Sequence, residues 1–255
     1  MTPALLRRSR LGNGVVGRHL RLHPVAATLG IFDEEVRPWE GTMQAIYSDE
    51  HRNLDGGYGL KYETTAEHPT FIATFTPWRG AQSHAELMDR ARYGVGIGVL
   101  LRDRGEGRVR IDRGGRPIVH YRLSPYDARH IRIGVKGTAR ILEAAGARRI
   151  VLGHAQLVDY EPGTRGSVAA FIRAADAAGF GPGGVSLFSF HQMGSASMGG
   201  SAQDSACDPE GQVWGVQDVV ICDASTFPTA SGVNPMVTIE AIAHMNASAL
   251  ASRLS

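Results

Sequence analysis

The sequence Gly232-Val233-Asn234-Pro235-Met236-Val237-Thr238-Ile239 predicts the start of a helix near the end of the chain. Asn234 is a favoured N-cap residue, and Pro235 suits the first helical position because the N–H that it lacks would have no partner there. The residues that follow, as far as Leu250, are compatible with a helix. The open N–H groups of such a start suit a phosphate, a carboxylate or another anionic group. From local sequence alone, Asn234 can equally be only a cap.

A second motif, Phe190-His191-Gln192-Met193-Gly194, follows the apolar segment Val185–Phe190 upstream of this helix. Between the two motifs, Val219–Cys222 is predicted to be a buried strand that delivers Asp223 into a turn. A histidine and an asparagine held close together can act on the O–H of an alcohol, so His191 is a candidate catalytic residue with Asn234. Taken alone, His191 is more simply interpreted as a hydrogen-bonded residue at a strand end.

Four spaced motifs resemble, in their order, the C-terminal region of the glucose-methanol-choline (GMC) oxidoreductases. They begin at His191, Asp208, Val220 and Gly232, and the likeness to that C-terminal region covers about residues 105–250. The His-Gln-Met-Gly and Val-Asn-Pro variants are most similar to the long-chain fatty alcohol oxidase branch of the family.

The resemblance extends upstream over Thr2–Ser9, Val16–Pro24 and Tyr47–Gly59, although Arg10 stands where the family usually has glycine. Family members begin with a strand, a Gly-x-Gly-x-x-Gly turn and a helix that bind the adenosine diphosphate half of FAD. This turn is not found in the sequence, and Gly94–Gly98 is predicted to be a strand because it continues into valine and leucine. The chain is therefore similar to the C-terminal half of a larger flavoenzyme.

The predicted fold class is α+β or α/β, with a mainly antiparallel substrate-domain sheet and covering helices. A C-terminal strand and helix would complete a GMC FAD-binding domain whose N-terminal dinucleotide-binding unit is absent. The resemblance assigns residues 1–30 to a segment leading out of the FAD-binding part, 31–186 to a substrate-binding domain, and 187–255 to a flavin-facing segment.

Several elements of the middle region are predicted from local patterns. Arg108–Asp112 and Pro117–Leu123 form a hairpin around a Gly-Gly turn, and Ser167–Ala178 forms a helix. Ser124 and Pro125 open another helix, which ends at Gly146 and buries one face. That face consists of Ile131, Val135, Ala139 and Leu142. Residues 30–100 are predicted to be extended and mainly β, with aromatic residues in the core or around an apolar pocket.

The resemblance implies that FAD is the cofactor and that hydride passes from the α-carbon of an accessible, apolar alcohol to the flavin. His191 would take the hydroxyl proton as general base, and Asn234 would donate a hydrogen bond to the alkoxide oxygen. The helix that begins at Pro235 would stabilise negative charge on the flavin, and Asp223 would bind its ribityl or pyrophosphate part. The implied FAD contacts are Asp223, Ala224, Asn234, Pro235, Met236 and Thr238.

Composition limits the partners. The 255 residues are 43% apolar with a net charge of +2, and the arginines are interspersed with acids, so no nucleic-acid partner is predicted. No segment approaches the ~20 apolar residues of a membrane helix. Cys207 and Cys222 lack the spacing of a zinc site or a disulfide framework, so no metal is predicted and a reducing, cytoplasmic location is expected.

Other classes of function stay open. The missing glycine-rich turn is also expected in a catalytically silent fragment, or in one subunit of a split flavoenzyme whose second chain supplies that unit. A serine hydrolase would combine Ser197 with His191 and Asp223. Ser195 weakens this alternative, because the Gly-x-Ser-x-Gly turn of such enzymes needs glycine at that position.

Overall fold

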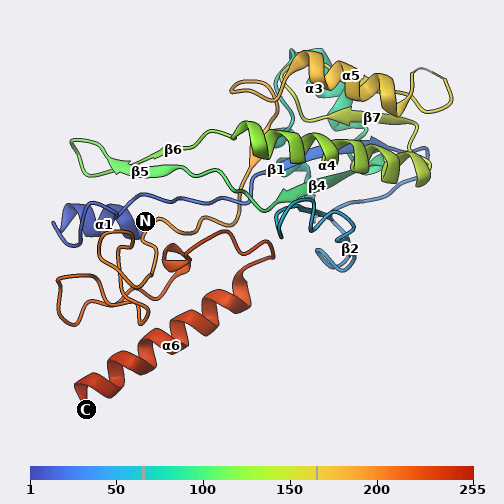
Figure 1. Cartoon of the computed structure of the whole chain (residues 1–255). Coiled ribbons are helices and arrows are strands. Elements are labelled where there is room, and N and C mark those ends of the chain that lie inside the picture. Colours follow the sequence, from blue (N-terminus) through green and yellow to red (C-terminus); the bar gives the residue numbers. More distant parts are fainter. Residues whose placement is uncertain (65–66, 165) are drawn as a thin grey trace. The chain divides into compact units, whose positions relative to one another are not determined.

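A computed structural model of the chain describes residues 1–64, 67–164 and 166–255. The chain forms two compact units, and Figure 1 labels many of their helices and strands. Unit 1 comprises Met1–His23, Arg102–Ser124 and Ser189–Ser255, and unit 2 comprises Pro24–Leu101 and Pro125–Phe188. The sequence analysis placed residues 102–124 in the substrate-binding domain, whereas their contacts assign them to unit 1.

Unit 2 is built on an antiparallel sheet in which β1 and β4 are the central pair (Figure 1). Val25 of β1 lies opposite Leu100 of β4, and Ile31 lies opposite Gly94. This pairing confirms the strand predicted for Gly94–Gly98. Across the sheet the strands are β2 (Tyr47–Ser48), β3 (Leu60–Glu63), β4 (Gly94–Leu101), β1 (Val25–Ile31), β7 (Arg149–Leu152) and β8 (Asp159–Tyr160), with β9 (Leu187–Phe188) also on β1.

One helix, α4 (Pro125–Ala144), packs along this sheet against β1, β3, β4 and β7. Its predicted apolar face is confirmed, because Ile131, Val135 and Ala139 are fully buried and Leu142 is 1% exposed. The contact is close at Gly134, where an added Cβ would come within 2.2 Å of Val99. Helix α5 (Val168–Ala178) confirms the helix predicted over Ser167–Ala178 and packs on α4 and β8. Ser167 caps it by accepting the N–H of Ala170.

Two short helices interrupt the region that was predicted to be mainly β. They are α2 (Pro69–Phe75) and α3 (Ala81–Asp89), followed by the 3-10 turn η1 (Ala91–Tyr93). The prediction was wrong there because such short helices show little periodicity in sequence. The start of α2 carried a local signal, since Pro69 occupies the first helical position and the ring of His68 accepts the N–H of Thr70.

Unit 1 joins the N-terminal segment to the predicted hairpin. Helix α1 (Thr2–Arg8) packs on β5 (Arg108–Ile111), which pairs with β6 (Pro117–His120) through a turn in which Gly115 has φ +76°. The N–H of Val109 donates to Gly17 O (2.7 Å), and Leu20 bridges to Gly107. These backbone bonds explain why residues 102–124 belong with the N-terminal segment.

The C-terminal part of unit 1 is mostly irregular but well packed. One buried cluster contains Leu6, Val16, Ala196, Ala206, Cys207, Val213 and Ile221. The strand predicted for Val219–Cys222 was wrong, because among the described residues this segment makes one bridge, from Val220 to Gln212. Its backbone bonds to the neighbouring turn, where Val213 N–H donates to Val219 O and Ile221 N–H donates to Gly211 O, both at 2.9 Å.

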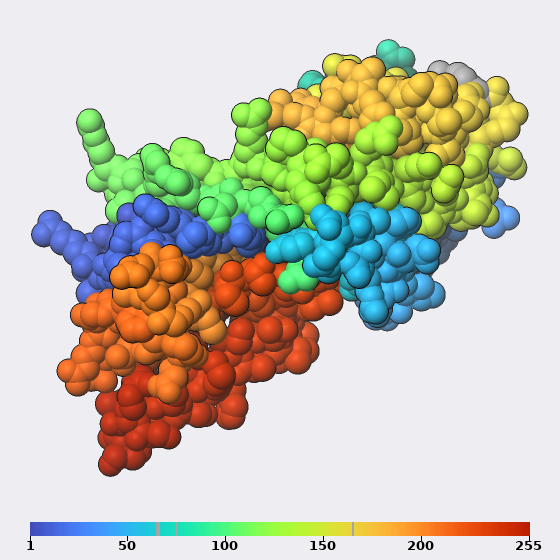
Figure 2. Space-filling view, viewed as in Figure 1, coloured from blue at the N-terminus to red at the C-terminus, as the bar shows by residue number. Residues whose placement is uncertain are grey.

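The last helix, α6 (Met236–Leu254), begins one residue later than predicted, with Pro235 as its N-cap. Ile239 and Ile242 pack against the buried cluster of Met193, Phe227 and Ala230. Asn246 is fully buried and its Nδ2 donates to Ile221 O at 2.8 Å. Other apolar side chains of α6 lie exposed, including Val237 at 70% and Leu254 at 66%. The C-terminal residues that form α6 are coloured red in the space-filling view of Figure 2. Within the described ranges, no helix combines the length and the hydropathy needed to cross a membrane.

Candidate active site

The two C-terminal motifs meet at a third residue, His23, within unit 1. The backbone N–H of Gly232 donates to His23 Nε2 at 2.9 Å, and His23 Nδ1 lies 3.2 Å from His191 Nδ1. The two imidazole rings stand edge to face, with centroids 5.3 Å apart and planes at 89°. His23 therefore connects the His-Gln-Met-Gly motif to the segment that carries Asn234.

The register of a short backbone bridge places the two histidines opposite each other. Arg21 and Met193 form an antiparallel bridge in which each N–H donates to the other's carbonyl at 2.9 Å. In an antiparallel pair, a residue two positions later on one segment faces a residue two positions earlier on the other. Two positions after Arg21 and two before Met193 are His23 and His191.

Buried hydrogen bonds fix the backbone at His23. The ring is fully buried, and the residue adopts the left-handed φ of 47°, which costs about 1–3 kcal/mol for a residue other than glycine. Asp103 holds this conformation, because its carboxylate accepts the N–H of His23 (3.1 Å) and of Leu22 (3.0 Å) and the hydroxyl of Tyr121 (3.0 Å). Burial raises the pKa of Asp103, although these hydrogen bonds act in the opposite direction.

Ser189 turns the chain into the His191 motif. Its hydroxyl donates to Leu22 O and accepts the N–H of His191 at 3.3 Å. The side chain of Gln192 folds back, and its Nε2 donates to Ser189 O at 2.8 Å. His191 is half-buried as a result, since its backbone is anchored while its ring lies against His23.

Asn234 lies two residues after Gly232, immediately before the N-cap of α6, and is half-buried. Gly232 has φ +73°, and an added Cβ would come within 2.9 Å of the Arg102 side chain. Arg102 is itself held in place because its Nε donates to Ala230 O at 2.9 Å. A larger residue than glycine would therefore be strained at this φ and would clash with the Arg102 side chain. Of the other predicted cofactor contacts here, Pro235 is buried, and Met236 and Thr238 are exposed at the start of α6.

Asp223 and Ala224 lie in a turn that packs against the segment following His191. Asp223 caps the 3-10 turn η2 (Ala224–Thr226), since its Oδ1 accepts the N–H of Ser225 at 2.7 Å, and its Oδ2 accepts the hydroxyl of Thr2. The N–H of Gly194 donates to Ala224 O at 3.1 Å. The turn is thus tied to the histidine motif by backbone bonds, and each carboxylate oxygen of Asp223 keeps lone-pair capacity for a further donor.

Ser225 has an unsatisfied polar atom in this turn. In the part of the chain that the structure describes, its Oγ is buried and has no hydrogen-bond partner. Leaving such a group unpaired costs about 1–3 kcal/mol, which a ligand atom could recover. The turn therefore fits a ligand rich in oxygen and nitrogen atoms, such as a flavin nucleotide. Sequence reasoning missed Ser225 and His23, although the Asp-Ala-Ser and Leu-His-Pro motifs contained them.

The geometry gives the serine hydrolase alternative no support. Ser197 is 5% exposed, which is unsuited to a nucleophile that must meet a substrate. Asp223 is bound to Thr2 and Ser225, and the Nδ1 of His191 faces His23. A hydrolase needs the aspartate to orient that histidine nitrogen.

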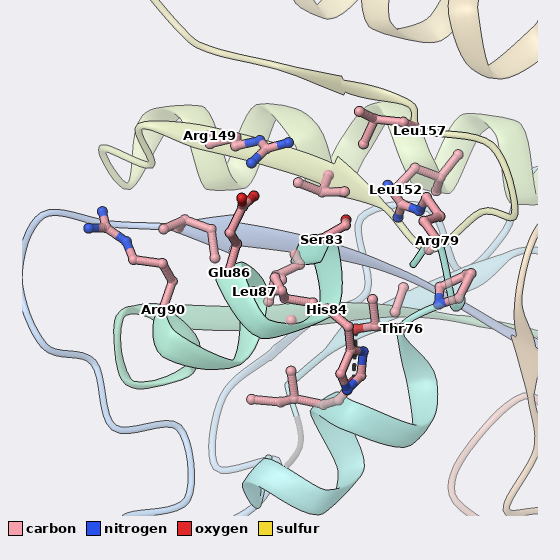
Figure 3. A pocket seen from close by; sticks show the side chains of 18 of the residues that line it. Thr76, Arg79, Ser83, His84, Glu86, Leu87, Arg90, Arg149, Leu152 and Leu157 are labelled. Atoms are coloured by element: carbon pink, nitrogen blue, oxygen red, sulfur yellow. Dashed lines mark hydrogen bonds between the residues drawn. The ribbon is translucent and has the colours of Figure 1, made fainter. Parts of the chain in front are cut away.

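Unit 2 contains a separate apolar cavity of 580 Å³. Its floor includes Ala27, Leu29 and Ile31 of β1, and α3 contributes Leu87. Figure 3 shows Ser83, Glu86 and Leu87 projecting from α3 into this space, with Arg149 of β7 across from Glu86. Half-buried Glu67 also lines the cavity, where its carboxylate accepts the N–H of Gly96 (2.9 Å) and desolvation raises its pKa. The apolar part of this lining suits an aliphatic chain, whereas charged residues such as Glu86 and Arg149 line the rest of the cavity.

Comparisons with known proteins agree with the motifs. Residues 103–243, more than half of the chain, match a family profile described as GMC oxidoreductase. Long-chain-alcohol oxidase FAO4A of Arabidopsis thaliana is 34% identical over 254 residues, which is 95% of this chain and 34% of that protein. The uncharacterized GMC-type oxidoreductase Rv0492c of Mycobacterium tuberculosis is 33% identical over 245 residues, which is 95% of this chain and 37% of that protein. The chain thus spans about a third of the length of these relatives.

Solved structures share the fold. Formate oxidase of Aspergillus oryzae RIB40 superposes with a TM-score of 0.64 at 16% identity, covering 99% of this chain and 52% of that one. Pyridoxine 4-oxidase from Mesorbium loti superposes with a TM-score of 0.59 at 18% identity, covering 92% of this chain and 43% of that one. At these identities the likeness supports the mixed fold with an antiparallel sheet that the sequence predicted.

Proposed function

The chain belongs to the GMC oxidoreductase family, and on that premise we propose that it supplies the proton-handling part of an FAD-dependent alcohol oxidoreductase. One observation carries this proposal: buried His23 binds Gly232 through one ring nitrogen and contacts His191 through the other. The candidate base and the segment bearing Asn234 therefore belong to one constellation rather than to separate surface features.

In the proposed reaction, His191 takes the proton of the alcohol hydroxyl as general base. Asn234, held at the start of α6, donates a hydrogen bond to the oxygen on which negative charge develops. Bound FAD supplies the hydride acceptor. General base catalysis typically contributes about 10²–10⁴-fold, so loss of His191 should remove most turnover without unfolding unit 1.

Two features of unit 1 support a flavin contact at the predicted residues. Pro235 has no side-chain oxygen with which to cap α6, so the first N–H groups of that helix stay open to an acceptor. The orphaned Oγ of Ser225 lies beside Asp223 and Ala224. We assign the anionic edge of the flavin to the start of α6, with Pro235, Met236 and Thr238, and the ribityl or pyrophosphate part to the Asp223 turn.

The proposed substrate is an apolar alcohol. The Arabidopsis relatives are named as long-chain-alcohol oxidases, and the cavity of unit 2 has an apolar floor of strand residues. Aliphatic ligands gain stability by burying methylenes, each worth about 0.8 kcal/mol, so a longer chain should bind more tightly in such a cavity.

FAD binding also needs a dinucleotide-binding unit, which we place outside these 255 residues, in the same polypeptide or in a second chain. The exposed apolar side chains of α6 support this, because a helix that is apolar on several faces is usually covered. A non-catalytic fragment is the alternative, and it predicts no response of flavin to alcohol in any assembly. The expected location remains the cytoplasm.

Absorption spectroscopy tests the proposal. The purified chain is titrated with FAD, alone and with a family dinucleotide-binding unit added in trans, and a long-chain alcohol is then added without oxygen. We expect bound flavin that bleaches, and we expect His191→Ala to retain flavin but lose bleaching. His19→Ala is the matched control, because His19 lies in the same unit but pairs with Glu106 at 2.8 Å. Bound flavin that alcohol never bleaches would support the non-catalytic fragment instead.

A further inference from the structure

We propose that His23 is a positioning residue that sets the tautomer of His191, so that the resting His191 carries its proton on Nε2. This inference deepens the proposed function, on which its catalytic consequence rests. The tautomer itself does not depend on the proposed function, because it follows from two hydrogen-bonding contacts of the buried His23 ring.

The first contact fixes which nitrogen of His23 is protonated. A backbone N–H can only donate, and the N–H of Gly232 points at His23 Nε2 from 2.9 Å. That nitrogen must therefore present a lone pair. A neutral imidazole has one N–H, so the proton of His23 is on Nδ1.

The second contact determines which nitrogen of His191 is protonated. His23 Nδ1 lies 3.2 Å from His191 Nδ1, and one proton must lie between the two nitrogens. Since that proton belongs to His23, the Nδ1 of His191 is the acceptor. A neutral His191 then carries its own proton on Nε2 and meets any ligand at that atom as a donor.

His23 cannot relieve the constraint by turning away. Its backbone is held by Asp103, its ring is fully buried, and its φ of 47° is tolerated only because these contacts enforce it. Gly232, whose N–H faces His23 Nε2, adopts a φ of +73°, a conformation that favours glycine at this position.

The tautomer of His191 depends on the position of the segment from Gly232 to Asn234. For His191 to present a lone pair at Nε2, its Nε2 proton must leave and the shared proton must move to its Nδ1. The Nε2 proton of His191 passes to water, and water delivers a proton to His23 Nε2, which requires the N–H of Gly232 to withdraw. Each ring then carries one proton again, so the pair stays neutral. The base-competent form is therefore reached only when the segment from Gly232 to Asn234 shifts.

Long-range 1H–15N correlation of the histidine-labelled chain tests the tautomer without any flavin. The spectrum is recorded near pH 8, more than a unit above the ordinary histidine pKa of about 6.5. We expect His23 protonated on Nδ1 and His191 protonated on Nε2, each as a single slow tautomer. A His191 proton on Nδ1, or averaging of its two tautomers in the wild type, would overturn the proposal.

Variants assign the signals and separate positioning from packing. His23→Phe keeps a buried ring but removes the donor, so His191 should change to an average of both tautomers. An unchanged Nε2 tautomer in this variant would contradict the proposal. His154 is the internal control, because Gln156 N–H donates to its Nδ1 (3.0 Å) and its Nε2 lies 2.9 Å from Gly179 O. Its Nε2 tautomer should persist in every variant that folds, and if His23→Phe does not fold, the wild-type spectrum decides.

This experiment and the flavin experiment fail independently. Flavin bleaching that depends on His191, together with freely averaging His191 tautomers, would remove the role of His23 and leave the proposed function intact. A fixed tautomer pair in a chain that never bleaches flavin would keep the positioning role and remove the alcohol chemistry.

Discussion

Asp103 is the residue on which the geometry of His23 depends, because one buried carboxylate accepts three donors from three different residues. Asparagine offers only one acceptor oxygen, so Asp103→Asn leaves a donor facing a donor. We expect the variant to lose about 1–3 kcal/mol of unfolding free energy, the cost of an unsatisfied buried group. Urea unfolding measures this loss, and Asp112→Asn, a carboxylate on the exposed hairpin, is the control.

The pH dependence of that loss follows from the pKa of Asp103. Burial raises the pKa of the folded carboxyl above its unfolded value of 3.8. The Asp103 carboxyl therefore contributes its full stabilisation at a pH below its pKa in the unfolded chain. That stabilisation declines as the pH rises through its pKa in the folded chain. The asparagine side chain of the variant cannot ionise, so the Tm advantage of the wild type over Asp103→Asn should shrink as the pH rises from about 4. An advantage that grows over this range would contradict the burial argument.

The two cysteines should differ in reactivity. Cys207 is fully buried, and burial raises the pKa of its thiol to about 12, whereas Cys222 is exposed. Thiolates are the reactive species, so a maleimide at mild alkaline pH should label Cys222 alone in the folded chain. Burial and the nearby Asp223 also raise the pKa of Cys222, which should slow its labelling. Mass spectrometry after labelling checks this, and rapid modification of Cys207 would show that the unit 1 core is open.

Helix α4 offers a matched pair of isoleucines for testing the packing of unit 2. Ile131 is fully buried against the sheet, and Ile141 is 39% exposed on the same helix. Ile131→Ala should cost about 2–5 kcal/mol because it leaves a cavity. Ile141→Ala should cost about 0.5 kcal/mol or less. Denaturant unfolding of both variants measures the difference, and equal losses would contradict the assigned orientation of the helix.

The cavity between α3 and the sheet should bind an alkyl chain. Leu87 lines it from α3, so Leu87→Trp should fill part of the space and weaken binding of a fluorescent long-chain alcohol by about tenfold, or ~1.4 kcal/mol. Ile118→Trp on the exposed β5–β6 hairpin is the control. Equal affinity in the cavity variant and the wild type would show that the probe binds elsewhere.

Elements with strong local signals were predictable from sequence, and those that depend on distant partners were not. Helix α4 has an apolar stripe and a proline start, and the β5–β6 hairpin has its glycine turn, so both were confirmed. The Val219–Cys222 strand failed because apolarity alone does not show which neighbour will pair with a segment. At the candidate site, the sequence predicted roles for His191 and Asn234, which stay predictions. It missed the contact of His23 with His191, since the bridge between Arg21 and Met193 is a long-range contact.

For the molecule as a whole, α6 is the helix whose exposed apolar residues favour contact with a further protein unit. Under the proposed function, the exposed apolar residues of this helix would be covered by the dinucleotide-binding unit that FAD binding needs. FAD should therefore bind the chain alone weakly and bind much more tightly when that unit is supplied. Equilibrium dialysis of FAD against the chain with and without the unit measures this, and equal affinity would mean that the chain needs no such partner.

The central claim is that His191 and Asn234 act as one site, joined through His23. Its most direct test is the rate of anaerobic flavin bleaching by a long-chain alcohol in the FAD-loaded assembly, measured for the wild type, His191→Ala, Asn234→Ala and the double variant. Groups that act as a unit are non-additive. We predict that the double variant is about as slow as the slower single variant, and losses that multiply independently would contradict a shared site.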